Sequence, residues 1–167
     1  NPNHITYTIR APKEEDAQAI MDFARILFAS TDQVLTTLEE YTITLEEEKK
    51  WINRPQTEPS TFILIAEADG KVIGLLDFAT RPRKKAAHTG EFGVSVHPDY
   101  QGRGIGRMLI ENLLVWAKTN AQVEKVFLNV MATNQRAIRL YKRLGFVEEG
   151  RHVKAVKQTD GQYVDLI

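Results

Sequence analysis

Apolar and polar side chains recur with two different periods in the first third of the chain. Over residues 5–9, apolar side chains alternate with threonines, which is the period of a half-buried strand. Over residues 14–28, apolar side chains recur at helical spacing behind an acidic start, which predicts an amphipathic helix. Thr44 and Glu47 form a capping box ahead of a second, short helix, which Pro55 and Pro59 are expected to end.

The middle of the chain predicts a β-hairpin. Residues 61–68 form a continuous apolar run typical of a strand that is buried on both faces. A second β-prone run covers residues 71–78, and the Asp69-Gly70 pair between the runs favours a tight primed turn. The basic segment 81–85 that follows is interpreted as a solvated loop.

The second half of the chain alternates strand and helix patterns. Strands are predicted over 91–96, 126–130, 146–153 and 163–166, and helices over 103–118 and 134–144, with Gly145 as a left-handed C-cap and Asp160-Gly161 in the last turn. No repeat or long linker divides the chain. The order of elements predicts one α+β domain over residues 1–167, with helices packed on a mixed sheet.

Composition narrows the class of protein. The 167 residues are 43% hydrophobic and carry 22 basic and 22 acidic side chains, which fits a globular domain rather than a disordered chain. Charge neutrality argues against nucleic-acid or anionic-lipid partners, and the absence of cysteine excludes disulfides and thiolate chemistry. No apolar run is long enough to span a membrane, and the start Asn1-Pro2-Asn3-His4 does not resemble a signal peptide. A cytoplasmic protein is expected.

A glycine-rich loop is the most informative segment of the sequence. Gly102, Gly104 and Gly106 alternate between a strand and a helix, and Arg103 adds a positive charge. Free N–H groups at a helix start, approached closely through glycine, bind phosphate well. The spacing fits neither a Walker loop nor a Rossmann loop, so a purely structural turn is the alternative interpretation.

Two motifs together resemble one family. The loop Gln101-Gly102-Arg103-Gly104-Ile105-Gly106 resembles the diphosphate-binding loop of the GNAT superfamily of acyl-CoA-dependent N-acetyltransferases. The run from Asn134 to Phe146 matches the family pattern N-x-x-A-x-x-x-Y-x-x-x-G-F. The resemblance implies a GNAT-like fold, with helices on both faces of the sheet and a splay between its fourth and fifth strands. It also implies a substrate-side half, about 1–90, and an acetyl-CoA-binding half, about 91–167.

The resemblance assigns roles in cofactor binding to named residues. It implies that the main chain of residues 101–106 holds the diphosphate of acetyl-CoA, and that Val94 and Val96 pair with the pantetheine arm. The Val94 N–H is then the candidate that polarises the thioester carbonyl. Asn134 is implied to contact the arm as well. From the residues alone, the two valines are ordinary buried strand residues and Asn134 is a helix N-cap.

Two residues are candidates for proton transfer. The resemblance places Tyr141 near the thioester sulfur, where it can protonate the departing thiolate, whereas a tyrosine on an apolar helix face is otherwise a core residue. Glu91 is the candidate base for the amine, directly or through a water chain, and a solvated strand end is its alternative role. His88 is a weaker candidate base, and His97 is expected to pack at the turn. No metal-ligand spacing is present, so no metal is expected.

The sequence therefore predicts an N-acetyltransferase that moves an acetyl group from acetyl-CoA to a primary amine by direct attack, through a tetrahedral intermediate. A non-catalytic acyl-CoA-binding module on the same fold and a nucleotide-binding domain are the alternatives. The acceptor, a small-molecule amine or a protein amine, stays open, although the glutamates at 39, 40 and 46–48 are compatible with a cationic one. By analogy with the family, a homodimer stays open too.

Overall fold

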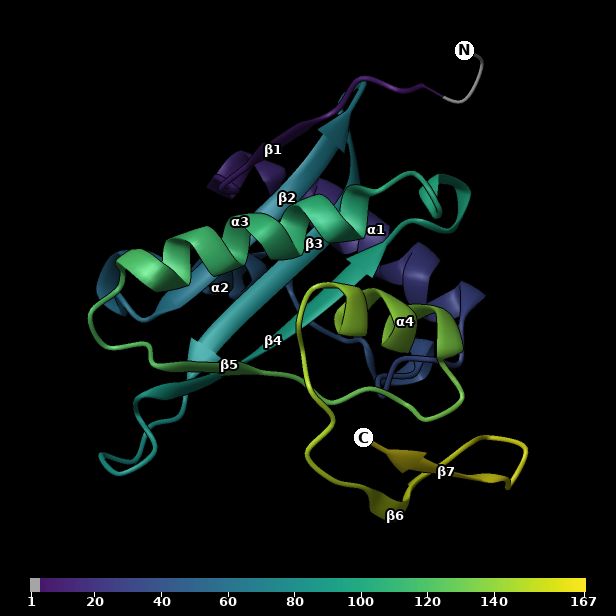
Figure 1. The fold of residues 1–167 in the computed structure, drawn as a ribbon. Helices are drawn as coiled ribbons and strands as arrows, with labels where there is room; N and C mark the ends of the chain where they lie inside the picture. The colour runs from purple at the N-terminus through teal and green to yellow at the C-terminus, as the bar shows by residue number, and fades with distance from the viewer. Residues whose placement is uncertain (1–3) are drawn as a thin grey trace.

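The computed structural model describes residues 4–167 (Figure 1). The N-terminal stretch 1–4 was expected not to be a signal peptide, and its first three residues lie outside the described residues. The main sheet has five strands in the order β1-β2-β3-β4-β5. Neighbouring strands are antiparallel except β4 and β5, which are parallel, so the sheet is mixed as predicted. The strands are β1 (Thr8–Arg10), β2 (Thr61–Ala68), β3 (Lys71–Thr80), β4 (Thr89–Val96) and β5 (Lys125–Phe127).

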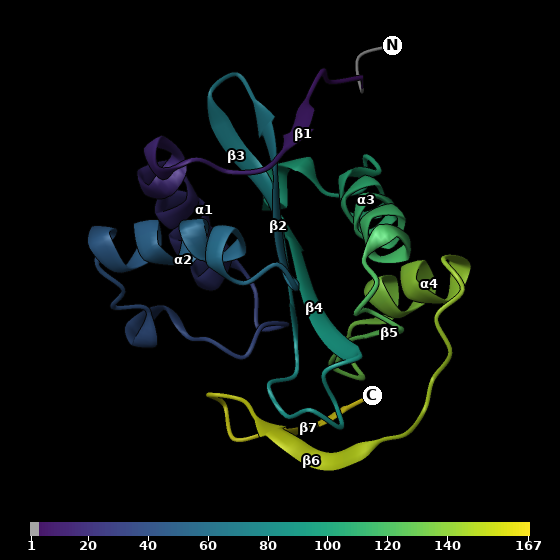
Figure 2. The ribbon, with the colours of Figure 1, turned by 90° about the vertical axis from the view of Figure 1, so that its left-hand side faces the viewer.

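Helices cover both faces of this sheet, which confirms the predicted α+β fold (Figure 2). The helices are α1 (Ala17–Ser30), α2 (Leu45–Thr57), α3 (Ile105–Thr119) and α4 (Gln135–Arg143). Apolar residues of α1 and α2 pack with Ile65 and Leu75 on one face. On the other face, α3 packs on Leu76, Phe78 and Phe92, and partly buried residues of α4 pack against the same cluster. Each helix therefore buries the apolar stripe that its sequence period predicts.

The β2–β3 hairpin and the end of α4 follow their sequence signals. Asp69 and Gly70 have φ of 51° and 76°, as the predicted primed turn requires. Gly145 has φ of 94°, and the Phe146 N–H donates to the Tyr141 carbonyl at 3.0 Å, which closes the helix as predicted.

Several predicted boundaries are wrong. The first strand, predicted over 5–9, covers Thr8–Arg10, and three other differences have clear physical reasons. Helix α2 continues past Pro55 to Thr57, because the proline lies in the last turn and the Glu58 N–H still donates to the Arg54 carbonyl at 2.9 Å. Strand β5 ends at Phe127 rather than at residue 130, because it leaves β4 there. The predicted strand 146–153 begins only at His152, because Phe146 turns inward and packs on Phe92 and Tyr141.

The end of the C-terminal hairpin pairs with the segment that follows β5. Strands β6 (His152–Lys157) and β7 (Tyr163–Leu166) form a two-stranded antiparallel sheet. Val130 and Ile167 exchange main-chain hydrogen bonds of 2.8 and 2.9 Å. This pairing holds the chain after β5 away from β4.

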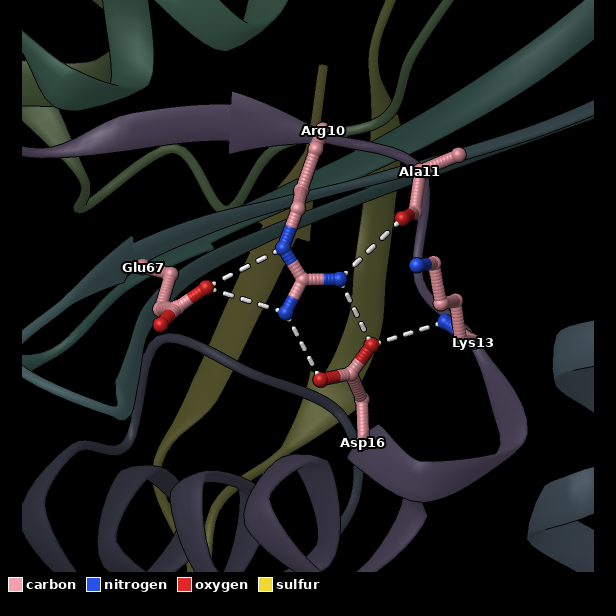
Figure 3. A network of polar contacts seen from close by, with 5 residues as sticks. All are labelled: Arg10, Ala11, Lys13, Asp16 and Glu67. Carbon is pink, nitrogen blue, oxygen red and sulfur yellow. Dashed lines mark hydrogen bonds and ion pairs between the residues drawn. The ribbon is translucent and has the colours of Figure 1, made fainter.

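Arg10 fastens the N-terminal strand to the rest of the sheet (Figure 3). Its guanidinium donates to Glu67 of β2 at 3.0 Å and to both carboxylate oxygens of Asp16 at 2.7 and 2.8 Å. The Lys13 N–H donates to the same carboxylate at 2.7 Å. The hydrogen bond from Arg10 has the largest effect, and together with the one from Lys13 it holds the pKa of Asp16 below its ordinary value. The network fixes the entry to α1 relative to β1 and β2.

Candidate active site

A gap opens between β4 and β5. The two strands pair only at Thr89, Gly90 and Glu91, opposite Lys125, Val126 and Phe127. Beyond Glu91, β4 continues to Val96 while β5 has ended. The predicted splay between the fourth and fifth strands is therefore present, and it begins directly after Glu91.

The main chain of Val94 and Val96 faces this gap. The His88 carbonyl accepts from Lys125 N–H on the β5 side at 3.0 Å, whereas the His97 N–H donates to Ile73 on the β3 side at 2.8 Å. The register between β3 and β4 has no shift, so even-numbered residues direct their main-chain groups to β5 and odd-numbered residues to β3. The Gln101 side chain donates to the Val96 carbonyl at 3.3 Å, and no strand of the described chain pairs with β4 here.

The glycine loop lies at the end of β4 and opens α3. Gly102 and Gly104 have φ of 76° and 82°, the left-handed region that favours glycine, whereas Gly106 lies inside the helix. Around Gly104, apart from its two chain neighbours, no heavy atom of the described residues lies within 4 Å of the position that a Cβ would take. The N-terminus of a 15-residue helix therefore borders open space, as an anion-binding cradle requires.

Arginine side chains surround this cradle. The Arg103 guanidinium lies 5.4 Å from the centre of the Tyr100 ring. Arg136, at the start of α4, places its Nη2 atom 2.6 Å from the position that a Cβ of residue 102 would take. Its Nη1 atom is 3.5 Å from the Gln101 Oε1 atom, so Arg136 links the two sequence motifs. Arg136 was not predicted from the sequence, because only the fold brings α4 over the loop.

Asn134 begins α4 as an N-cap, which confirms the structural part of its predicted role. Its side-chain oxygen accepts from the Ala137 N–H at 3.3 Å. Its contact with acetyl-CoA stays a prediction.

Tyr141 lies beside the gap, on the face of the sheet that α3 and α4 cover. Its ring packs edge-on against Phe92 and Phe146, with centroid distances of 6.0 and 6.1 Å. Burial raises the pKa of Tyr141 to about 12. The phenol is therefore fully protonated at neutral pH and can donate a hydrogen bond.

Glu91 lies on the opposite face of the sheet from Phe92 and Tyr141, because successive residues of a strand point to opposite faces. Its carboxylate is exposed and accepts from the Asn129 side chain at 3.1 Å. Asn129 follows β5, so this hydrogen bond crosses the mouth of the gap. Asn129 was not predicted as a site residue, although an amide within the apolar run 126–130 is a signal in the sequence.

The two histidines near β4 differ in their surroundings. His88 is exposed at the start of the strand. His97 accepts from the Asp99 N–H at 3.1 Å and packs edge-on against Tyr100, so it lies at the turn as predicted.

Asp77 of β3 is a further acidic residue near the gap that the sequence analysis missed. It is paired with Gly93 of β4, and its side chain keeps contact with solvent. Partial desolvation by the surrounding protein, followed by the nearby charge of Glu91, raises the pKa of Asp77 to about 6. Its signal in the sequence was a carboxylate inside an apolar strand, where aspartate is rare.

An open groove of about 560 Å³ runs along β5 beside Tyr141, with Phe127, Asn129 and Phe146 in its lining. Within residues 4–167, no group of three or more His, Cys, Asp or Glu side chains could hold a metal ion. In the same residues, no helix has the length and apolar character needed to cross a membrane.

Comparison with known proteins identifies the class of this fold and site. The model of the acetyltransferase (GNAT) family matches residues 25–146, which is more than half of the chain. The chain therefore belongs to the GNAT family of acetyltransferases, as the two motifs predict. Members of this family use acetyl-CoA as the acetyl donor.

Individual relatives cover nearly the whole chain. L-amino acid N-acetyltransferase AaaT of Escherichia coli is 28% identical over 157 residues, covering 94% of this chain and 92% of that protein. The crystal structure of a GNAT-family acetyltransferase from Streptococcus pneumoniae has a TM-score of 0.92 at 25% identity and covers 96% of both chains. The structure of yncA, a putative acetyltransferase from Salmonella typhimurium with acetyl-CoA, has a TM-score of 0.84 at 25% identity, covering 96% of this chain and 90% of that one.

Proposed function

We propose that this protein transfers an acetyl group from acetyl-CoA to a primary amine by direct attack of the amine on the thioester. One observation carries the proposal: β4 leaves the main chain of Val94 and Val96 without a strand partner along a gap that ends at the glycine loop. Unpaired main-chain groups need hydrogen-bond partners, and a pantetheine arm carries two amides that can supply them. The whole chain, residues 1–167, is proposed to act as one N-acetyltransferase domain.

The proposal gives the residues around the gap separate tasks. The N–H groups of residues 101–106 and the side chain of Arg136 face the cradle and bind the diphosphate of acetyl-CoA. The Val94 N–H stabilises the negative charge that develops on the thioester oxygen, and Asn134 contacts the arm. Glu91 and Tyr141 lie on opposite faces of the sheet, so the amine approaches from one side and the thiolate leaves toward the other.

The proton balance of the reaction follows from these positions. Glu91 accepts one proton from the ammonium form of the acceptor, directly or through water, and the free amine forms the C–N bond. As the C–S bond breaks, the Tyr141 hydroxyl donates a hydrogen bond to the sulfur. With a pKa of about 12, Tyr141 does not protonate a free thiolate whose ordinary value is about 8.5. Its proton therefore moves only together with bond cleavage, and the nitrogen of the intermediate returns a proton to it.

The test is turnover with acetyl-CoA and a panel of primary amines, followed by release of free thiol. Tyr141→Phe is expected to lower kcat by about a hundredfold while acetyl-CoA still binds, since proton transfer contributes about that factor. Glu91→Gln is expected to lower kcat/KM for the amine. Tyr163→Phe changes an exposed tyrosine of β7 and serves as the matched control.

Two outcomes contradict the proposal. Binding of acetyl-CoA without turnover of any amine favours the non-catalytic binding module. A rise in melting temperature with ATP or NAD, but not with acetyl-CoA, favours the nucleotide-binding alternative.

A further inference from the structure

Asp77 and Glu91 are diagonal neighbours on adjacent strands. Asp77 is paired with Gly93, and Glu91 is paired with Ala79, in a register without shifts. Their side chains therefore point to the same face of the sheet, and diagonal neighbours lie about 7–8 Å apart, within reach of a long side chain. Leu75 points to this face too and packs against the apolar cluster of α1 and α2. The two carboxylates thus lie on the face opposite Tyr141.

Gly93 leaves the space between Asp77 and the gap free of side-chain atoms. The Asp77 Oδ1 atom is 3.3 Å from the position that a Cβ of residue 93 would take. Residue 93 directly precedes Val94, whose N–H is proposed to face the thioester. A group held by Asp77 is therefore one residue along the strand from the reacting carbonyl.

Within residues 4–167, the Asp77 carboxylate forms no ion pair, although Arg54 acts on it from a distance. The hydrogen bond that lowers its pKa comes from its own main-chain N–H, and partial desolvation by the surrounding protein together with the charge of Glu91 outweighs it. Arg54 of α2 is the cation that acts on Asp77, but its Nε atom is already 2.6 Å from the Glu58 carboxylate. The charge of Glu91 therefore acts on Asp77 more strongly than that of Arg54, and a bound cation would relieve the repulsion between the two acids.

We propose that Asp77 binds the acceptor as a cation beside Glu91, and that the preferred acceptor is an aliphatic diamine rather than an α-amino acid. This inference rests on the proposed function and names its acceptor. An ammonium group between the two carboxylates gains from both charges, and a second ammonium group gains further. An α-carboxylate beside the reacting nitrogen would add a third negative charge, with Arg54 already paired to Glu58.

The chemistry of the step stays balanced. Asp77 holds the ammonium form and keeps its own charge, while Glu91 accepts the proton that the nitrogen must lose. The neutral amine then attacks the acetyl carbon, and its second proton leaves as the amide forms. Asp77 is thus an acceptor-binding residue, and Glu91 is the base.

The experiment measures steady-state kinetics with 1,4-diaminobutane and with L-methionine at about pH 8, where Asp77 is ionised. Wild type is expected to have the higher kcat/KM for the diamine. Asp77→Asn is expected to raise the KM for the diamine about tenfold or more, with the KM for acetyl-CoA unchanged. Asp77→Glu restores the charge and is expected to recover part of the loss. Glu124→Gln, at an exposed position before β5, controls for net charge.

The outcomes separate this inference from the proposed function. Removing a charge that is repelled by Glu91 should not impair folding, so the melting temperature of Asp77→Asn is expected to match or exceed that of wild type. A preference of wild type for L-methionine, or equal losses for both acceptors in Asp77→Asn, overturns the inference. Turnover that still depends on Glu91 and Tyr141 in that case leaves the proposed function standing. Absence of turnover with every amine overturns both.

Discussion

At the scale of single residues, the two motifs could be read from the sequence, whereas the groups that face them could not. The local backbone dictates that Gly104 adopts a left-handed conformation and that Asn134 caps a helix, so residue type and position suffice. Asp77 and Arg136 acquire their surroundings from other elements. Their contacts depend on strand register and on where α4 lies, which short-range patterns do not encode.

The glycines of the loop are expected to respond differently to alanine. Gly104→Ala places a Cβ on a residue with φ of 82° and should lower the free energy of unfolding by about 1–2 kcal/mol. Gly106→Ala meets Val96 and Leu140 at ordinary distances of 3.6 and 3.8 Å inside α3, and should raise stability by about 0.5–1 kcal/mol. Urea denaturation of the two variants measures the difference. Equal effects at both positions would contradict the assignment of the strained residue.

At the scale of elements, helices and the central hairpin follow from hydrophobic period, whereas the ends of strands beside the gap do not. The mainly apolar run 126–130 is interrupted by Asn129, and β5 pairs with β4 only as far as Phe127. After that, the chain pairs with Ile167 near the C-terminus. A strand boundary that depends on competition between two distant partners cannot be read from a local pattern.

Hydrogen exchange checks the direction of the β4 main chain. The N–H groups of Gly93 and Ser95 face β3, so they are expected to exchange slowly with and without acetyl-CoA. The N–H groups of Val94 and Val96 face the gap, so they are expected to exchange faster in the free protein and to slow when acetyl-CoA is added. Protection of all four groups without acetyl-CoA would mean that the gap is closed in solution.

At the scale of the whole molecule, the Arg10 network joins the N-terminal segment 10–16 to Glu67 of β2, which is 57 residues from Arg10 in the sequence. The side chains of Arg10 and Asp16 are 31% and 16% exposed, so the pair is shielded enough to contribute to stability. The network lies on β1 at the edge of the sheet, away from the gap between β4 and β5. It therefore supports the fold without taking part in the proposed chemistry.

Asp16→Asn is expected to lower the free energy of unfolding by about 1–2 kcal/mol at neutral pH. The pKa of Asp16 is lower in the folded protein than its ordinary value of 3.8, so the unfolded state takes up the proton first. The stabilisation by Asp16 is therefore complete above that value and is lost as the pH falls through the lowered folded pKa. Denaturation of both proteins across this range measures it, with Asp69→Asn in the exposed β2–β3 turn as the control. A difference between Asp16→Asn and wild type that is constant down to low pH would contradict the role of the ion pair.

Because β4 has no strand partner beyond Glu91 on its β5 side, ligand binding there is coupled to the stability of the fold. If the donor lies in the gap as proposed, it supplies the missing strand, and the folded state gains hydrogen bonds that the unfolded chain cannot make. The melting temperature should accordingly climb with the logarithm of donor concentration once sites are saturated. Simple thermal melts can thus rank acyl-CoA thioesters of different chain length before any acceptor has been found.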